Sequence, residues 1–246
     1  MVEPMFHRVF DEPAIAGSVF EIAGAEAKHA ISVKRMRVGE AIQVTDGAGI
    51  RVRGVVDAIN GNKLIVRVSE SLHEPAPALQ LTLVQALAKG DRDELAIQAA
   101  TELGVFEVTP WQADRSISRW IGLKEDKGVE RWQTIVSEAA KQSLRSWVPV
   151  VTAPIESHSL KSLIESFDLV LVLDPTAGDG IASAQIPKSG RVALIVGPEG
   201  GISEAELGLA EQSGAVRVHL GEPILRTSTA GIAAISAILT LSGQWS

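Results

Sequence analysis

The sequence predicts an α/β protein in which a small β-barrel precedes a larger domain built on a parallel sheet. Short segments with the period-two alternation of strands fill the first part of the chain, up to the proline- and alanine-rich stretch HEPAPAL (73–79). After that stretch, predicted strands alternate with predicted helices. Three of the later strands are continuous apolar runs, which is typical of strands buried on both faces of a sheet.

The first domain is predicted to span residues 1–74, a length that can fold alone. Turn sequences, DGAG (46–49) and NGNK (60–63), separate its later strands. One helix-like segment, AEAKHAISVKRM (25–36), lies among the strands. The predicted strands are HRVF (7–10), SVFEI (18–22), AIQVTD (41–46), IRVRGVVDAI (50–59) and KLIVRVSE (63–70).

The second domain is predicted to span residues 75–246, with strands and helices in alternation. Asp91 and Glu94 have the spacing of a capping box, and Gly104 marks the end of the helix that follows them. Ser203 and Glu206 form a second capping box. The predicted strands are LQLTLVQAL (79–87), VFEVTPW (105–111), LVLVLD (169–174), RVALIVG (191–197) and VRVHLG (216–221), and the predicted helices are 91–104, 128–145, the segment after Ser203 and TAGIAAISAILTL (229–241).

Composition narrows the class of protein. The 246 residues, 46% hydrophobic and 22% charged, are typical of a soluble globular chain, and we expect neither a membrane span nor a signal segment. Cysteine is absent, which excludes disulfides, thiolate nucleophiles and Cys-based zinc sites and is consistent with a reducing cytoplasm. Because the net charge is −7, any RNA binding has to come from local basic patches.

No H-E-x-x-H motif or histidine cluster indicates a metal, and His158 and His219 are interpreted as packing or surface residues.

A glycine-rich turn, GPEGG (197–201), connects an apolar strand to a helix. Its glycines permit positive φ angles and a close approach of the backbone to a ligand, and Pro198 stiffens the turn. The turn lacks the Lys-Ser/Thr of a phosphate-binding loop and the spacing of a dinucleotide fingerprint. Taken alone, it is equally consistent with a connection that binds no ligand.

Two further loops follow buried strands. LGEPILRTSTAGIAA (220–234) leads into an apolar helix that Thr227 or Ser228 is expected to cap, and it places Arg226 just before the helix N-terminus. The helix dipole disfavours a cation there, which makes Arg226 a candidate functional residue. LVLDPTAGDG (171–180) is the third such loop. Because ligands bind at the carboxyl ends of parallel strands, the three loops together predict a pocket.

These motifs resemble one family. LIVGPEGGISEAE followed by LGEPILRTSTA is similar to the ribosomal RNA small-subunit methyltransferase E family, which methylates N3 of a uridine in 16S rRNA and belongs to the SPOUT superfamily. The resemblance extends over nearly the whole chain through LVQALAKGDRDELAIQAATELGVFEVTP, DRSISRW, EAAKQSLRSWVP and HAISVKRMRVGEAIQVTDGAG.

The resemblance implies a PUA-like β-barrel and an α/β domain whose C-terminal part forms a deep trefoil knot. It also implies S-adenosylmethionine bound by three knot loops, at 173–178, 196–201 and 220–229, without a metal. It implies a homodimer, a cytoplasmic location and 16S rRNA in the small subunit as the partner. The expected cofactor-binding residues are Leu173, Asp174, Pro175, Val196, Gly197, Pro198, Glu199, Gly200, Gly201, Leu220, Gly221, Ile224, Leu225 and Thr229.

Methylation of N3 requires removal of the weakly acidic imide proton, and a cation near the uracil oxygens would stabilise the resulting anion. Arg226 is the expected catalytic residue for this task. The absence of cysteine excludes C5 methylation through a covalent cysteine adduct. We expect RNA to be bound by basic side chains of both domains, namely Lys34, Arg35, Arg37, Arg51, Arg53, Lys89, Arg92, Arg115 and Arg145.

Two alternatives remain open at this point. One is ribose 2′-O methylation, although related enzymes carry an Asn-containing segment where this chain has ILRTSTA. The other is an RNA-binding module without catalysis, because the family usually has Glu where this chain has Ser228. Either that acid contributes to RNA binding or uridine orientation, or Ser228 replaces it simply as a helix cap.

Overall fold

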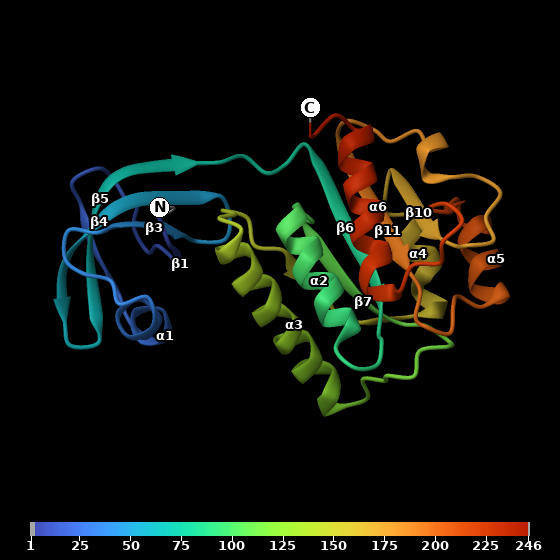
Figure 1. Ribbon diagram of the computed structural model, residues 1–246, viewed down its shortest axis with the longest axis horizontal. Helices are drawn as coiled ribbons and strands as arrows, with labels where there is room; N and C mark the ends of the chain where they lie inside the picture. Colours follow the sequence, from blue (N-terminus) through green and yellow to red (C-terminus); the bar gives the residue numbers. More distant parts are fainter. Residues whose placement is uncertain (1–2, 246) are drawn as a thin grey trace. The chain divides into compact units, whose positions relative to one another are not determined.

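The computed structural model describes residues 3–245 and divides the chain into two compact units. The first unit is the chain up to Ala76 together with Ala140–Val148, and the second is Pro77–Ala139 with the chain from Pro149 onward. Figure 1 shows the elements of both units. Among residues 3–245, every helix falls short of the length and apolar character that crossing a membrane requires.

The first unit is built on a five-stranded sheet with the order β1-β3-β4-β5-β2. β1 pairs with β3 in parallel, and the other neighbours are antiparallel. The predicted turns at 46–49 and 60–63 are confirmed. The first strand was predicted at 7–10, but it is Met5–His7 and shares only His7 with the prediction. Inward-facing residues such as Phe6, Ile42 and Leu64 form one buried core. The strands are β1 (Met5–His7), β2 (Val19–Ile22), β3 (Ala41–Thr45), β4 (Ile50–Asn60) and β5 (Lys63–His73).

The helix predicted over 25–36 ends early. It consists of α1 (Gly24–Lys28) followed by a π-helical turn, His29–Val33. Arg35 then adopts a left-handed conformation with φ 54°. The chain reverses there, so the Met36 amide donates to the Ala30 carbonyl at 3.0 Å and the Met36 side chain enters the core. Burial of Met36 explains why the helix stops where its sequence would allow it to continue.

Residues Ala140–Val148 bind the β3–β4 turn within the first unit. The Gly49 amide donates to Ser146 O at 3.1 Å, and the Val148 amide donates to Gly47 O at 2.9 Å. Gly49 has φ 103°, and a Cβ there would lie 2.6 Å from the Glu74 carbonyl oxygen. The glycine of this turn is therefore required by both its conformation and its surroundings.

The second unit contains a parallel sheet with the order β12-β10-β11-β6-β7-β8, and β9 also pairs with β7. All of its strand pairs are parallel, as predicted from the alternation of strands and helices. The strands are β6 (Leu79–Ala86), β7 (Glu107–Gln112), β8 (Val150–Val151), β9 (Ile155–Glu156), β10 (Leu169–Leu173), β11 (Gly190–Val196) and β12 (Val216–Val218).

Helices cover both faces of this sheet. Val84 and Ile195 share one buried cluster with residues of α4 and α5. Their chain neighbours Leu83 and Val196 lie on the opposite face, beside Gly231 of α6, as the two-residue period of strands requires. Figure 1 shows α2 and α6 next to each other across that face. The helices are α2 (Arg92–Leu103), α3 (Leu123–Gln142), α4 (Leu160–Ile164), α5 (Glu204–Gln212) and α6 (Thr227–Leu241).

Some of the predicted helix caps are confirmed by the structure, and one is wrong. The capping box of Ser203 and Glu206 is confirmed, with bonds of 3.2 and 2.8 Å in the two directions. Gly104 ends α2 in a left-handed conformation, as predicted. The capping box assigned to Asp91 is wrong, because Asp91 itself is left-handed and its side chain caps nothing within the described residues. Asp93 instead accepts from the Ala88 amide at 3.0 Å.

The start of α6 also differs from expectation. Arg226 is the N-cap residue, and neither Thr227 nor Ser228 caps the helix. Thr227 is buried and uses its hydroxyl elsewhere, as described below. The prediction that Arg226 directly precedes the helix N-terminus is confirmed.

Candidate cofactor pocket

A cavity of about 630 Å³ lies at the carboxyl ends of β10, β11 and β12. The three strands are neighbours of this parallel sheet, so the loops that follow them emerge at one edge. The volume lies within the range usual for small-molecule sites. The expected cofactor residues on its wall are Leu173, Asp174, Pro175, Val196, Gly197, Pro198, Glu199, Gly201, Leu220, Gly221, Ile224 and Leu225. Gly200 and Thr229 do not line it.

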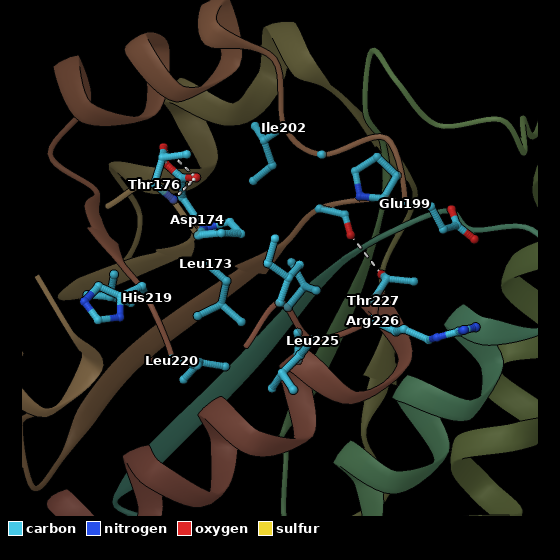
Figure 2. A pocket seen from close by; sticks show the side chains of 18 of the residues that line it. Leu173, Asp174, Thr176, Glu199, Ile202, His219, Leu220, Leu225, Arg226 and Thr227 are labelled. Carbon is cyan, nitrogen blue, oxygen red and sulfur yellow. Dashed lines mark hydrogen bonds between the residues drawn. The ribbon is translucent and has the colours of Figure 1, made fainter. Parts of the chain in front are cut away.

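One part of the pocket is apolar. Figure 2 shows Leu173, Leu220 and Leu225 grouped together, with Ile202 on the wall beyond them. Ile224 and Leu225 are respectively 78% and 39% exposed, which is unusual for large aliphatic side chains in a loop next to a cavity. These residues form a surface that a flat, largely apolar group such as a nucleobase would cover.

The glycine turn is tightly packed. A Cβ on Gly197 would lie 2.6 Å from Ile202 Cγ1, and Gly201 has φ 74°. Arg115, which also lines the cavity, donates from Nη1 to the carbonyl oxygens of Gly200 and Ile202 at 3.3 and 3.4 Å. A Cβ on Gly200 would lie 3.0 Å from Arg115 Cβ, so Gly200 packs closely against this arginine. Glycine at 197 and 201 is therefore demanded by packing and by backbone conformation, respectively.

Asp174 is fixed at the start of the first loop. It forms an ion pair with Arg217 of β12, and its Oδ1 accepts from the Thr176 amide at 3.0 Å. Burial opposes ionisation of this carboxyl group, but the Thr176 amide and the Arg217 guanidinium outweigh that effect and lower the pKa of Asp174. The carboxylate is 8% exposed, so its charge is balanced by the protein.

Thr227 joins two of the loops to the centre of the sheet. Its hydroxyl donates to the Gly197 carbonyl oxygen at 2.8 Å and accepts from Gln85 Nε2 at 2.8 Å (Figure 2 shows the first bond). Gln85, the penultimate residue of β6, is fully buried. Because polar groups buried away from water need partners, the three residues form one rigid connection beneath the pocket.

Arg226 and Glu199 lie at the other end of the pocket. Figure 2 shows their side chains extending toward the same side. Glu199 forms an ion pair with Arg92 of α2 at 3.0 Å. Within residues 3–245 the Arg226 guanidinium has no hydrogen bond or ion pair, and the residue is exposed. A cation without an internal partner at a helix N-terminus is available to a ligand.

The basic residues predicted to bind RNA differ in their surroundings. Lys34, Arg35 and Arg37 are exposed around the turn that follows the π-helix, and Arg53 is half exposed, 3.8 Å from Glu70. Lys89 and Arg92 lie in and after the β6–α2 connection, and Arg92 and Arg115 also line the pocket.

Arg51 and Arg145 are less accessible. The Arg51 side chain is 16% exposed, and its Nη2 donates to Leu144 O at 2.6 Å. Arg51 therefore holds the two segments of the first unit together, and we leave it out of the proposed RNA surface. Burial lowers the pKa of Arg145 to about 10, which indicates a guanidinium largely withdrawn from water.

Several pocket residues escaped sequence reasoning. Thr176, Ile202, His219 and Thr227 line the cavity without having been predicted as binding residues. His219, interpreted as a packing or surface residue, accepts from the Gly221 amide through Nδ1 at 2.9 Å. Position within the predicted loops 173–178 and 220–229 was the signal that would have found Thr176 and Thr227, whereas Ile202 lies one residue beyond the loop 196–201. No cluster of three or more His, Cys, Asp or Glu side chains able to hold a metal occurs in the described part of the chain.

Comparison with known protein families first identifies the class to which this protein belongs. Residues 74–239 match the RNA methyltransferase domain, and residues 22–69 match the RNA methyltransferase PUA domain. The second sheet with its pocket and the first sheet therefore correspond to the catalytic and PUA modules of an RNA methyltransferase.

The relatives narrow this class. The ribosomal RNA small subunit methyltransferase E of Mycobacterium bovis is 38% identical over 233 residues, which cover 93% of this chain and 89% of the relative. The chain belongs to the ribosomal RNA small subunit methyltransferase E family. A crystal structure of a Neisseria gonorrhoeae member bound to S-adenosyl methionine is 29% identical, with a TM-score of 0.86 and 98% of each chain covered. A Legionella pneumophila methyltransferase in complex with the same cofactor gives a TM-score of 0.87 at 27% identity, again over 98% of each chain.

Proposed function

We propose that this protein transfers a methyl group from S-adenosylmethionine to N3 of a uridine in 16S rRNA of the small ribosomal subunit. The observation that carries the proposal is the pocket at the ends of β10, β11 and β12, with Arg226, an arginine that has no partner among residues 3–245, at one end. Membership of the family and the cofactor-bound relatives support the reaction class. Since the proposed substrate is ribosomal RNA, we place the enzyme in the cytoplasm.

The pocket suits S-adenosylmethionine in its chemistry. Leu173, Leu220 and Leu225 offer an apolar surface for the adenine ring, and the turn at 197–201 brings backbone polar groups close to a ligand. The cofactor, when bound, supplies an electrophilic methyl group. No phosphate has to be held, so the absence of a lysine-containing phosphate loop is consistent with this ligand.

Arg226 is proposed to stabilise the uracil anion. A guanidinium presents planar, oriented donors that fit the carbonyl oxygens flanking N3. Charge on those oxygens grows as the proton leaves N3, so interaction with Arg226 strengthens toward the transition state.

Ser228, where the family usually has Glu, is the second residue of α6 and is only partly exposed. We propose that activity does not depend on an acid there.

We propose that the C-terminal part of the second unit is tied in a trefoil knot. The chain leaves β12 at one edge of the sheet, yet α6 packs against β11, β6 and α2. The segment 219–226 must therefore cross the carboxyl edge of β10 and β11, where the other two pocket loops lie. That crossing supports a threaded arrangement, which is rare among proteins.

We also propose a homodimer, since a two-fold assembly would double the basic surface available to RNA. The proposed RNA-binding residues in the first unit are Lys34, Arg35, Arg37 and Arg53. Those in the second are Lys89, Arg92 and Arg115. Arg145 is retained as a weaker candidate because burial, which also lowers its pKa to about 10, limits its access to RNA.

One experiment tests the function directly. Small subunits are incubated with the protein and S-adenosylmethionine, and their nucleosides are then separated and identified by mass spectrometry. Formation of N3-methyluridine supports the proposal. A 2′-O-methylated nucleoside would favour the ribose alternative, and the absence of any methylated product, together with no cofactor binding by calorimetry, would favour an RNA-binding module.

A further inference from the structure

The carboxylate of Glu199 is held by only one of its two oxygens. Oε1 accepts hydrogen bonds from the Lys89 amide at 3.2 Å and from Arg92 Nη1 at 3.0 Å. Among residues 3–245, no donor lies within hydrogen-bonding distance of Oε2. The side chain is 22% exposed and lines the cavity. One oxygen is thus anchored, and the other is left for a ligand.

The two groups that donate hydrogen bonds to Glu199 belong to a different part of the chain than Glu199 itself. Glu199 belongs to the glycine turn after β11, whereas Arg92 opens α2 and Lys89 precedes it. Two donors on Oε1 fix the plane of the carboxylate, so Oε2 has a defined direction. Glu199 and Arg226 extend toward the same side of the pocket, as Figure 2 shows. A carboxylate, which can accept a proton, and a guanidinium cation therefore lie at the same end of the cavity.

We propose that Glu199 is the proton acceptor of the reaction. The inference rests on the proposed N3 methylation. In this step the N3–H bond breaks, its electron pair stays on N3 and the proton moves to Glu199 Oε2. A bond forms between N3 and the methyl carbon as the methyl–sulfur bond breaks, and the sulfur keeps that bonding pair. The glutamic acid then loses its proton to water, which restores the carboxylate.

The two charged side chains have complementary tasks. An imide proton is far less acidic than a carboxylic acid, so a carboxylate alone is a weak base for it. Arg226, by stabilising the anion, lowers the pKa of N3 and narrows this difference. The charged or titratable residues that contact Glu199 or line the cavity with it are Lys89, Arg92, Arg115, Asp174, Glu204, His219 and Arg226.

A structural role has to be distinguished from this one. The Glu199–Arg92 ion pair also connects the glycine turn to α2, and a pair of that kind stabilises a loop without taking part in chemistry. Glu199→Gln separates the two roles, because the amide oxygen still accepts from Arg92 and from the Lys89 amide but the side chain no longer takes up a proton. Glu130→Gln, an exposed change on α3, is the matched control.

The test compares two RNA substrates. Methylation by wild type, Glu199→Gln and Glu130→Gln is measured on small subunits containing either uridine or 5-fluorouridine, whose fluorine makes N3 more acidic. On uridine, Glu199→Gln should lose about 10²–10⁴-fold in kcat, the usual contribution of a general base. Its calorimetric affinity for S-adenosylmethionine should change far less than kcat, because the amide keeps the shape and the anchoring hydrogen bonds of the side chain. The defect should shrink on 5-fluorouridine and at alkaline pH, where N3 gives up its proton more readily.

The outcomes are distinct. A wild-type enzyme that forms no N3-methyluridine refutes the proposed function itself. A wild-type enzyme that forms it, with a Glu199→Gln defect equal on both substrates and at every pH, leaves the function standing and shows that Glu199 is structural. A Glu199→Gln variant as active as Glu130→Gln overturns the inference as well. Because each comparison of substrates is made within one variant, partial loss of folded protein does not affect it.

Discussion

Thr227, the first residue of the C-terminal helix, donates its hydroxyl hydrogen to the Gly197 carbonyl oxygen at 2.8 Å. The same hydroxyl accepts from Gln85, so α6, the glycine turn and β6 meet at one buried oxygen atom. The turn that forms the floor of the pocket is thereby fixed by the residue that follows Arg226. This contact therefore links the residue next to the proposed catalytic arginine to the turn that lines the pocket.

Thr227→Val tests this contact. Valine keeps the shape of threonine but removes the partner of the Gly197 carbonyl and one of the two acceptors of Gln85 Nε2, which still donates to Ala86 O at 3.1 Å. We therefore expect a loss of about 1–3 kcal/mol in the free energy of unfolding. Urea denaturation measures it. Thr227→Ser keeps the hydroxyl and should recover most of the loss. Equal stability of the valine variant and wild type would show that the contact contributes nothing.

Gly201→Val tests the glycine turn. The φ of 74° is unfavourable for a β-branched residue, at a cost of about 1–3 kcal/mol, although the nearest atom to a new Cβ is 3.8 Å away. If the turn distorts to relieve this strain, affinity for S-adenosylmethionine should fall about 10–100-fold. Calorimetry gives the affinity. The control, Gly208→Ala in α5, meets no atom within 4 Å and should bind as wild type does. Unchanged affinity of the valine variant would remove the turn from the binding site.

Asp174→Asn tests the ion pair with Arg217. Because the folded-state pKa of Asp174 is lowered, its contribution to stability is fully present above the unfolded pKa of about 4 and is lost as the pH falls through the lower folded-state value. At neutral pH the variant should therefore be less stable than wild type by about 1–3 kcal/mol. Toward pH 2 the two stabilities should converge. Glu211→Gln, whose side chain is 50% exposed, should change stability by less than about 1 kcal/mol.

The basic turn of the first unit is tested by replacing Lys34, Arg35 and Arg37 with alanine. If these side chains contact phosphates, RNA affinity should fall, and the slope of log affinity against log salt should decrease by about 0.7–0.9 per lost contact. Replacing Lys124, Lys127 and Lys188, three exposed lysines of the second unit, removes the same charge and should leave the slope unaltered. Equal slopes for the two triple variants would indicate only an effect of net charge.

Arg226→Lys tests the proposed stabilisation of the uracil anion. Lysine keeps the charge but loses the planar set of donors, and loss of oriented donors at a developing anion costs about 10²–10³ in rate. Affinity for S-adenosylmethionine should change far less. Since alkaline pH deprotonates N3 without help, the defect should shrink as the pH rises. A defect that is constant across the pH–rate profile would assign Arg226 to RNA positioning instead.

The sequence was informative wherever local chemistry decides the structure. The Ser203–Glu206 capping box and the end of α2 at Gly104 depend on neighbouring residues alone, and both were predicted correctly. Asp91 has the same spacing to Glu94, yet Asp93 satisfies the nearby amide because it is buried and Asp91 is left-handed. Whether a side chain caps a helix depends there on the path of the preceding chain, which periodicity does not reveal.

For the candidate site, too, the sequence predicted some features and could not predict others. Strand ends followed by glycine or proline located the three loops, because parallel strands present their carboxyl ends at one edge. The partners of individual side chains could not be predicted. Arg51 and Arg53 look equivalent on their strand, but a segment 93 positions further along the chain accepts a hydrogen bond from Arg51. Thr227 appeared to be a cap because its partner Gln85 lies on a distant strand.

The bond between Gln85 and Thr227 joins residues 142 positions apart, and α6 occupies the middle of one sheet face. During synthesis, β6 and α2 leave the ribosome long before the helix that covers them. Their apolar face stays exposed until the chain is nearly finished, which makes this stage slow and vulnerable to aggregation. Several residues between Val218 and Ala230 line the pocket, so a nascent chain lacking this final segment is expected to bind no cofactor.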